Sequence, residues 1–517
     1  MEPIRIGIDV GGTHTDAVAM RGMDVLGAIK TSTTQPISAG ILNAVDQVLI
    51  EAALEPASIA AVILGTTQFT NAVIERRQLS KVAAIRAGLP SGRDLPPFTD
   101  WPDDLVAAVK GAAIPLPGGV TFDGAPLSKL QDADIDAACT QATHYAAAAV
   151  STVFGPLDSA DEQRITAALQ SVMPPDRIVG STSIGSMGLL ERENAAILNA
   201  SLLAFAQEVT AAISSSLQDK AFTCPLFLTQ NDGTLMDLET AARFPARTFA
   251  SGPTNSLRGA ALLSGVQDAI VIDIGGTTSD VGVLKDGFAR QSRMGVDVGG
   301  VRTNFRMPDI LAIGLGGGSI VSNDGSSLGP HSVGHKLPLE GRVFGGPTLT
   351  ATDIAVQDGT LNIGAGPSTD ICAPAVVETA SNKLHSMLDD AIARMCGRDK
   401  KPVLLVGGGA ILVTRHLSQA AEVIRPPHAG VANAVGASIA QAAGEVDQIV
   451  PYRDTDRTEA INTAKAQAAD QAVRNGAKED SVTVLDIEET PFSYMENKAT
   501  RLRVKAVGDL DFARLAS

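Results

Sequence analysis

The chain has 517 residues, more than one hydrophobic core usually supports, so two or three domains are expected. Its formal charge is −16 and only 3% of its residues are aromatic, which disfavours binding to nucleic acid or to anionic membranes. Its four cysteines are widely spaced, its N-terminus has no apolar signal core, and no uninterrupted apolar stretch approaches a membrane span. We therefore expect a cytoplasmic protein.

An internal repeat is the most informative feature of the sequence. Residues 6–20 read IGIDVGGTHTDAVAM and residues 270–284 read IVIDIGGTTSDVGVL, and the two segments align without a gap. The alignment matches Asp9 with Asp273 and Asp16 with Asp280. Because the offset is about half of the chain, the repeat predicts two lobes of related design rather than a solenoid of short units.

Each copy reads as a β-hairpin in which a pair of glycines joins two apolar runs. Glycines let backbone N–H groups approach a ligand without a Cβ in the way, and a preceding aspartate suits hydrated Mg²⁺. Two facing turns would hold a polyphosphate from both sides, which predicts ATP with Mg²⁺ as the cofactor. The expected phosphate contacts are Gly11, Gly12, Thr13, Gly275, Gly276 and Thr277.

The four aspartates of the repeat are the expected catalytic residues. We assign Asp9 and Asp273 to Mg²⁺ and its waters, whereas Asp16 and Asp280 either orient the nucleophile or brace the loops. The alternative to a phosphate site is a pair of duplicated tight turns without a ligand.

A second group of polar residues follows a predicted strand at Ala61–Leu64. Thr66, Thr67, Thr70 and Asn71 would begin a helix that faces the cleft, and helix N-termini suit anionic or carbonyl ligands. The alternative is that a threonine caps the helix. We take Thr66, Thr67 and Asn71 as candidate substrate contacts.

Two glycine-rich segments complete the candidate site. The loop at Gly317, Gly318 and Ser319 either approaches the substrate or forms a turn. Residues 403–411 read VLLVGGGAI, a buried strand followed by Gly407, Gly408 and Gly409. In sugar kinases, actin and Hsp70 chaperones such an element lies against adenosine, and a plain strand-to-helix turn is the alternative. His331 and His335 have the spacing of a metal pair, but the glycine between them makes a helix doubtful, so metal binding is left open.

Several segments together resemble the hydantoinase A/5-oxoprolinase family, which includes acetone-carboxylase-type subunits. The segments lie in order along the chain and are residues 65–77 (GTTQFTNAVIERR), 190–194 (LEREN), 230–233 (QNDG), 251–253 (SGP) and 313–319 (IGLGGGS). Leu64 stands where the family has a histidine. From the resemblance, we expect the chain to lack most of the larger C-terminal domain of the usual member. These departures bear on substrate identity more than on nucleotide binding.

The repeat and the resemblance together imply an α/β protein with a two-lobed, actin-like ATPase (ribonuclease H-like) fold and a small C-terminal α+β cap. We expect a first lobe at 1–190, a second lobe at 191–450 and the cap at 451–517. Within the cap, residues 458–475 read as a helix, and residues 481–487 and 500–507 read as strands.

The resemblance also implies an activity: ATP-dependent opening of a small cyclic amide or imide, such as a hydantoin, 5-oxoproline or a related lactam. Phosphoryl transfer to the ring carbonyl would activate it toward water. A second hydantoinase-type subunit and an oligomer are implied, and coupling to carboxylation instead of hydrolysis stays open. A small-molecule kinase of the same superfamily and a non-metabolic ATPase switch are the alternatives.

Overall fold

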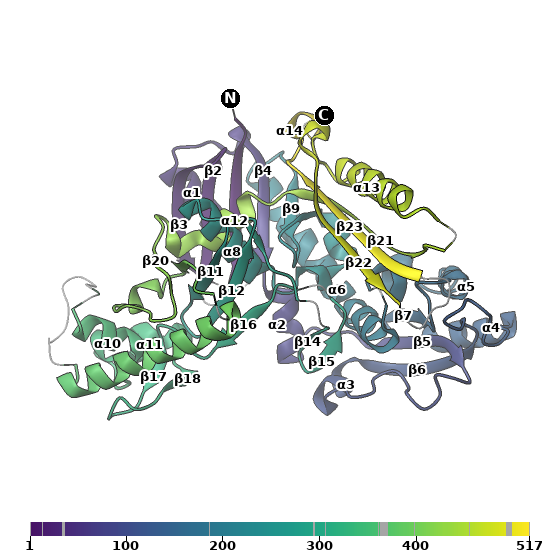
Figure 1. Ribbon diagram of the computed structural model, residues 1–517, viewed down its shortest axis with the longest axis horizontal. Coiled ribbons are helices and arrows are strands. Elements are labelled where there is room, and N and C mark those ends of the chain that lie inside the picture. The colour runs from purple at the N-terminus through teal and green to yellow at the C-terminus, as the bar shows by residue number, and fades with distance from the viewer. Residues whose placement is uncertain are drawn as a thin grey trace.

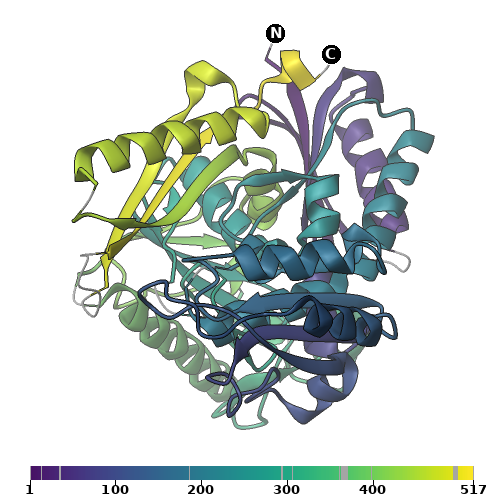
Figure 2. The ribbon, with the colours of Figure 1, turned by 90° about the vertical axis from the view of Figure 1, so that its right-hand side faces the viewer.

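The computed structural model describes residues 2–12, 14–33, 37–185, 187–292, 295–305, 307–359, 361, 371–397, 399–453, 455–492 and 499–515. Two sheets of similar topology form the centres of two lobes, and a separate four-stranded sheet and a three-stranded C-terminal sheet adjoin them (Figure 1). Both ends of the chain lie at the same end of the molecule (Figures 1 and 2).

The first lobe is built on a six-stranded sheet. Its strands in spatial order are β10 (Leu235–Asp237), β9 (Leu226–Thr229), β4 (Ile59–Thr66), β1 (Ile4–Val10), β2 (His14–Arg21) and β3 (Asp24–Ser32). Strands β1, β2 and β3 form an antiparallel meander, whereas β4 runs parallel to β1 and β9 runs parallel to β4. One face of the sheet packs on helices α1 (Ile37–Glu51) and α6 (Leu189–Asp219).

The second lobe repeats this arrangement. Its sheet has the order β13 (Phe288–Ala289), β12 (Ser279–Lys285), β11 (Ala269–Ile274), β19 (Val403–Val406) and β20 (Val423–Ile424), with β16 (Ile310–Ile313) pairing with β12. As in the first sheet, the first strands of the lobe are antiparallel, and a later strand, β19, runs parallel to the first strand, β11. An antiparallel meander followed by parallel strands on the other side of its first strand is the sheet of the ribonuclease H-like fold. Both halves of the sequence repeat therefore fold as the first two strands of equivalent sheets.

Two helices lie between these sheets. Helix α8 (Ser251–Ser264) packs on β11, β12 and β19, and helix α12 (Ala432–Ser438) packs on β1, β2 and β4. The helices approach each other closely because glycine stands at the contacts: a Cβ on Gly259 would lie 1.8 Å from the carbonyl oxygen of Ala432. A Cβ on Gly436 would lie equally close to the carbonyl oxygen of Asn255, 1.8 Å away. The Ala- and Gly-rich sequence of α12 is thus explained by packing.

A four-stranded parallel sheet forms a separate domain between β4 and α6. Its strands in spatial order are β6 (Lys110–Pro117), β5 (Val82–Leu89), β7 (Ala147–Thr152) and β8 (Ile178–Gly180). Its helices are α3 (Asp103–Val109), α4 (Asp132–Ala142) and α5 (Ala160–Leu169), and helix α2 (Gln68–Glu75) precedes it. Arg86 on β5 donates to Glu193 on α6 at 2.7 Å, and both side chains are buried, so an ion pair joins this domain to the first lobe.

The C-terminal unit is a three-stranded antiparallel sheet covered by one helix. The strands are β21 (Ala442–Pro451), β23 (Ala499–Gly508) and β22 (Thr483–Pro491), and the helix is α13 (Arg457–Arg474). The alanines of α13 pack on apolar residues of β21 and β23. The small α+β unit predicted from the sequence is present, and its expected helix and strands agree with α13, β22 and β23.

The remaining elements are short or lie around the two lobes. They are α7 (Leu238–Arg243), β14 (Val296–Val298), β15 (Val301–Thr303), β17 (Ser319–Val321), β18 (Leu328–Ser332), α9 (Leu337–Glu340), α10 (Ala351–Gln357), α11 (Pro374–Cys396) and α14 (Phe512–Leu515).

Two expected domain boundaries differ from the arrangement of the strands. The boundary placed at residue 190 falls at the start of α6, and β9 and β10, which follow it, belong to the first sheet. The boundary placed at 451 falls at the end of β21, which belongs to the C-terminal sheet. The sequence gives no local signal for either junction, because strand pairing decides them.

Helix α6 is the one described helix that is long and apolar enough to cross a membrane. Of its most apolar 18-residue window, 61% is buried inside the protein, as in a core helix.

Candidate active site

The two glycine turns of the repeat have the same geometry. The N–H of Gly11 donates to the carbonyl oxygen of His14, and the N–H of Gly275 donates to that of Thr278, both at 2.9 Å. The strand registers are equivalent as well, since Asp9 pairs with Asp16 and Asp273 pairs with Asp280. Each turn therefore places one aspartate on either side of its glycines, at the end of a sheet.

The carboxylates of the two turns lie close enough to affect one another. Burial is the largest cause of the raised pKa of both Asp9 and Asp273; the charge of Asp273 adds to the shift of Asp9, and the charge of Asp16 adds to the shift of Asp273. Lys30 on β3 is the basic residue of this group, and its ammonium contacts both oxygens of Asp16 at 2.6 and 2.7 Å. The tertiary structure thus brings the aspartates of both repeats near one another, and their role as a shared site stays a prediction.

Burial and like charge raise the pKa of Asp9 and of Asp280. Burial, followed by the charge of Asp16, raises the pKa of Asp9 to about 7. Burial, followed by the charge of Asp273, raises the pKa of Asp280 to about 7. The site has four carboxyl groups and one lysine, so protonation of a carboxyl group or binding of a cation is favourable there.

The helix pair between the lobes supplies two partners that the sequence analysis missed. Ser256 on α8 donates its hydroxyl to Asp273, and Asn433 on α12 donates its amide to Asp9 at 2.9 Å. The other oxygen of Asp9, Oδ1, is buried and has no hydrogen-bond partner in the described part of the chain. The position of Ser256, three residues after the 251–253 motif, could have indicated it as a site residue. Asn433 had no sequence signal.

The turns leave open space at their tips. A Cβ on Gly12 or on Gly276 would meet nothing within 4 Å. Across the described residues, no protein acceptor receives the N–H of Gly12 or of Gly276. Thr13 lies outside the described residues, and the exposed Thr277 follows Gly276 on the second turn.

The candidate residues after β4 lie beside the first turn. Thr67 donates its hydroxyl to the carbonyl oxygen of Val10, and its methyl group would lie 3.7 Å from a Cβ on Gly252. Asn71 donates to the Thr67 hydroxyl at 3.5 Å, and both side chains are partly exposed. Thr66 is buried, and its hydroxyl accepts the N–H of Gln68 at the start of α2. Thr66 therefore matches the capping alternative, whereas Thr67 and Asn71 face the region of the first turn.

The glycine loop at 316–319 packs against the second turn. The N–H groups of Gly317 and Gly318 donate to the carbonyl oxygens of Gly275 and Gly276 at 3.0 and 2.7 Å. Ser319 is completely buried, and its hydroxyl accepts the N–H of Gly316 at 2.8 Å. The loop braces the second turn, and the hydroxyl of Ser319 is directed into the loop rather than toward open space.

The expected adenosine element also reaches the second turn. Gly407 has a φ of +81°, and a Cβ there would lie 2.2 Å from Oδ1 of Asp273. The N–H of Gly409 donates to the carbonyl oxygen of Ile274 at 2.7 Å. Gly408 differs from both, because a Cβ there would meet nothing within 4 Å. Close packing explains Gly407 and Gly409, which leaves Gly408 as the glycine with room for a ligand.

Within the ranges that the structure describes, no group of three or more His, Cys, Asp or Glu side chains is arranged to hold a metal ion by itself. His331 lies in β18 and His335 lies in a short 3₁₀ turn, and both are exposed, so they do not share a helix face.

Comparison with known families agrees with this geometry. The family model described as hydantoinase/oxoprolinase matches residues 192–368, and the model of the hydantoinase/oxoprolinase N-terminal region matches residues 5–173. The chain belongs to the hydantoinase/oxoprolinase family. The resemblance inferred from the sequence motifs is thereby confirmed.

Two members of the family with curated names are similar to the chain. The caprolactamase subunit alpha of Pseudomonas jessenii is 25% identical over 417 residues, which cover 75% of this chain and 60% of that protein. The acetophenone carboxylase gamma subunit of Aromatoleum aromaticum is 26% identical over 392 residues, which cover 69% of this chain and 53% of that protein. The matched part of the chain thus spans little more than half the length of these relatives.

Two solved structures show that the fold is shared. The ATP-dependent caprolactamase from Pseudomonas jessenii superposes with a TM-score of 0.78 and 21% identity, over 98% of this chain and 88% of that chain. The nucleotide-free acetone carboxylase superposes with a TM-score of 0.69 and 17% identity, over 99% of this chain and 88% of that chain. The predicted two-lobed α/β fold is confirmed.

Proposed function

We propose that this chain uses ATP to open the ring of a small cyclic amide or imide, such as a hydantoin, 5-oxoproline or a related lactam. The observation that carries the proposal is the pair of equivalent glycine turns, one from each lobe, whose aspartates lie near enough that the charge of Asp273 adds to burial in raising the pKa of Asp9. Family membership supports the reaction class, because one relative is named a caprolactamase and another a carboxylase subunit.

The residues present fit Mg²⁺ and ATP. The buried Oδ1 of Asp9 lacks a partner among the described residues, and the carboxyl groups around it carry excess negative charge. Mg²⁺ keeps several waters and is usually bound through one or two carboxylates and the substrate phosphates, so a cage made only of side chains is not required. Phosphates fit the open space at the tips of the two turns, because the N–H groups of Gly12 and Gly276 have no acceptor among the described residues.

In this proposal, Asp9 and Asp273 hold the metal and its waters, and Gly408 lies beside the nucleoside. Bound ATP with Mg²⁺ supplies the phosphoryl group that activates the amide carbonyl toward water. Asp16 is braced by Lys30, so it positions the first turn. Asp280 has no ion pair in the described part of the chain, and its pKa is raised to about 7, which suits a group that accepts a proton from water near neutral pH.

The substrate would lie near the first turn, against Thr67 and Asn71, which are partly exposed there. Gly317 and Gly318 would act by holding the second turn in place. A partner subunit is part of the proposal, because both relatives are named as subunits.

One assay tests the function. The purified protein with Mg·ATP is offered hydantoin, 5-oxoproline and related lactams, and phosphate release and ring opening are followed together. We expect phosphate release that depends on one of these compounds and is matched by opened ring. A phosphorylated compound that persists would indicate a kinase, and ATP turnover indifferent to every compound would indicate an ATPase switch.

Direct ATP binding separates failure of the site from absence of a partner. Binding of ATP that requires Mg²⁺ and is lost in Asp273→Ala would support the site even if turnover needs a second subunit. A protein that is folded but binds no ATP would contradict the proposal.

A further inference from the structure

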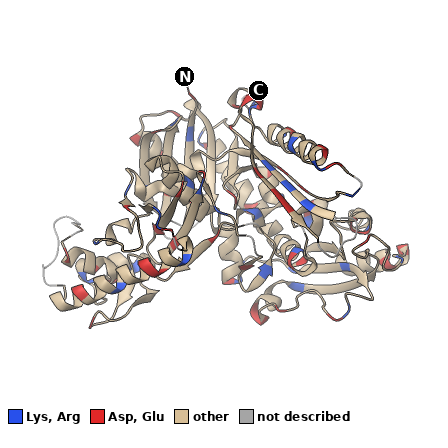
Figure 3. Cartoon of the chain, in the orientation of Figure 1, with Lys and Arg blue, Asp and Glu red and all other residues tan. Residues whose placement is uncertain are grey.

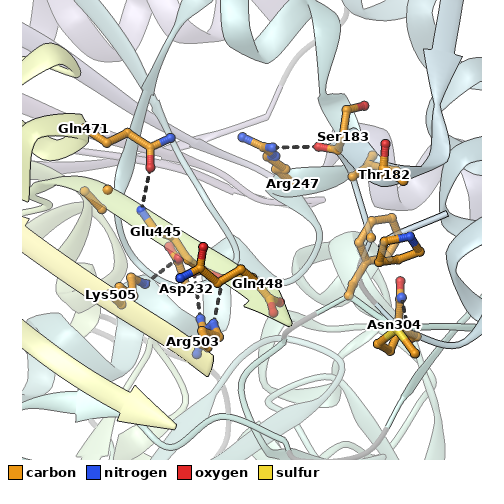
Figure 4. Close-up of a pocket in the computed structure, with 18 of the residues that line it drawn as sticks. Thr182, Ser183, Asp232, Arg247, Asn304, Glu445, Gln448, Gln471, Arg503 and Lys505 are labelled. Atoms are coloured by element: carbon orange, nitrogen blue, oxygen red, sulfur yellow. Dashed lines mark hydrogen bonds and ion pairs between the residues drawn. The ribbon is translucent and has the colours of Figure 1, made fainter. Parts of the chain in front are cut away.

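A cavity of about 480 Å³ lies between the first lobe, the four-stranded domain and the C-terminal sheet. This volume is in the range of small-molecule sites. Thr182 and Ser183 line one side, and Glu445, Arg503 and Lys505 of the C-terminal sheet line the other (Figure 4). None of the four aspartates of the glycine turns lines the cavity. The cavity is therefore separate from the proposed ATP site.

The C-terminal sheet turns a charged face toward this cavity. Alternate residues of β23 are basic, and Figure 3 shows these positions along the strand. Each of them has an acidic partner: Arg503 contacts Glu445 at 2.6 Å, Lys505 contacts Asp232 at 2.5 Å, and Arg501 contacts Asp447 at 2.8 Å. The opposite face packs on α13, so the alternation of β23 separates a core face from a cavity face.

Within the part of the chain that the structure describes, Arg247 is the one cation lining the cavity without such a partner. Among the described residues its guanidinium has a single hydrogen-bond acceptor, the carbonyl oxygen of Ser183 at 3.1 Å, and no ion pair. It lies over the ring of Phe244, 4.3 Å from the ring centre. Figure 4 shows Arg247 on the side of the cavity opposite Lys505 and Arg503.

Removing this guanidinium from bulk water is costly. Burial lowers the pKa of Arg247, whereas the more distant charges of Glu445 and Asp232 raise it. Arg247 is partly exposed, and a partly buried cation whose neighbours are a carbonyl and an aromatic ring is incompletely compensated. An anion in the cavity would complete its environment.

We infer that this cavity binds a small molecule through a single carboxylate, which Arg247 holds with its free guanidinium edge. The planar guanidinium matches the two oxygens of a carboxylate. The other charges of the cavity wall are matched in ion pairs, so Arg247 supplies one positive charge for a ligand. A carboxylate balances it, whereas a phosphate monoester would add a second negative charge without a partner. The inference does not depend on the proposed ring-opening activity.

The test compares ligands that differ in the carboxylate. Binding of 5-oxoprolinate, acetate, the neutral 2-pyrrolidinone and inorganic phosphate is measured by calorimetry and by thermal shift, at constant ionic strength set with chloride. We expect a carboxylate to bind and stabilise the full chain, and 2-pyrrolidinone and phosphate not to do so. Arg247→Met should weaken carboxylate binding by about tenfold to a hundredfold, as expected for the loss of a charged hydrogen-bonded pair.

Arg243→Met is the matched control. Arg243 is exposed and lies 5.4 Å from the same Phe244 ring, but it does not line the cavity. This variant should bind the carboxylate as the wild type does.

Thermal unfolding without ligand gives an independent readout. Because Arg247→Met removes an incompletely compensated charge and keeps an unbranched side chain, we expect an unfolding midpoint equal to or above that of the wild type. A clearly lower midpoint would mean that Arg247 is structural. Equal responses to carboxylates and to chloride, or an undiminished carboxylate response in Arg247→Met, would also overturn the inference.

Discussion

Substituting Gly276 by alanine separates the role of the second turn in folding from its role in binding. A Cβ at Gly276 meets no atom within 4 Å, and its φ is not in the left-handed region. Alanine should therefore fit, and the loss of backbone freedom in the unfolded chain should stabilise the protein by about 0.4–1 kcal/mol. The added methyl group occupies the open space at the tip of the turn, where the phosphate is proposed to lie.

The expected cost to ATP binding follows from the contact that is lost. A hydrogen bond from a backbone N–H to a charged phosphate contributes about 1.5–3 kcal/mol. Displacing the phosphate from Gly276 should therefore raise the Kd for Mg·ATP by about tenfold or more. Gly12→Ala, at the equivalent position of the first turn, should behave in the same way because its Cβ also meets open space.

The assay is a titration with Mg·ATP, accompanied by thermal unfolding of each variant. Gly92→Ala in the four-stranded domain is the control, because its Cβ would make only ordinary contacts of 3.5 Å, with Arg86 and with the carbonyl oxygen of Gly88. Wild-type ATP affinity in both Gly12→Ala and Gly276→Ala would refute the phosphate assignment. A large loss of stability would refute the geometric argument.

Three further predictions test other parts of the structure. Asp9→Asn should abolish ATP turnover, because Asp9 is proposed to hold the metal. Circular dichroism should show a retained fold, because the substitution removes one charge from a crowded carboxylate cluster. Turnover at the wild-type rate would contradict the metal assignment. Gly436→Ala should destabilise the protein by about 1–3 kcal/mol in urea unfolding, because its Cβ would lie 1.8 Å from the carbonyl oxygen of Asn255, and unchanged stability would contradict the close helix contact. Lys505→Met should cost about 3–5 kcal/mol in urea at neutral pH, because it leaves the Asp232 carboxylate without its buried partner. Burial alone would raise the pKa of Asp232, but Lys505 outweighs it and the net pKa is lowered. The stabilisation is therefore complete above an unfolded pKa of about 4 and is lost as the pH falls further, so the difference between Lys505→Met and wild type should shrink in acid.

The duplicated turns were the part of the site most accessible to sequence reasoning. Two gapless copies of a strand, a glycine pair and a second strand define their local structure, because glycine at the tip and alternating apolar residues are local requirements. The prediction that the copies belong to equivalent sheets held for the same reason. The equivalent registers of Asp9 with Asp16 and of Asp273 with Asp280 follow directly from the hairpins.

Residues whose role depends on distant segments were harder to predict. Gly407 and Gly409 looked like a nucleoside contact, yet close packing against Asp273 and Ile274 accounts for them. Ser319 looked like a substrate contact, yet it is buried and holds its own loop. A glycine or serine that approaches a ligand and one that approaches another segment have the same local sequence.

The sequence by itself determined the hairpins, the family and the presence of a small C-terminal unit, because each depends on residues close together in the chain. Only the tertiary structure decided which partners complete the aspartates, namely Asn433 for Asp9 and Ser256 for Asp273, since helices from far along the chain deliver them. No motif in the sequence indicated the charged cavity around Arg247. It forms where the first lobe, the four-stranded domain and the C-terminal sheet meet. Arg501 and Arg503 find acidic partners within the C-terminal sheet, whereas Lys505 contacts Asp232 only when these parts pack together.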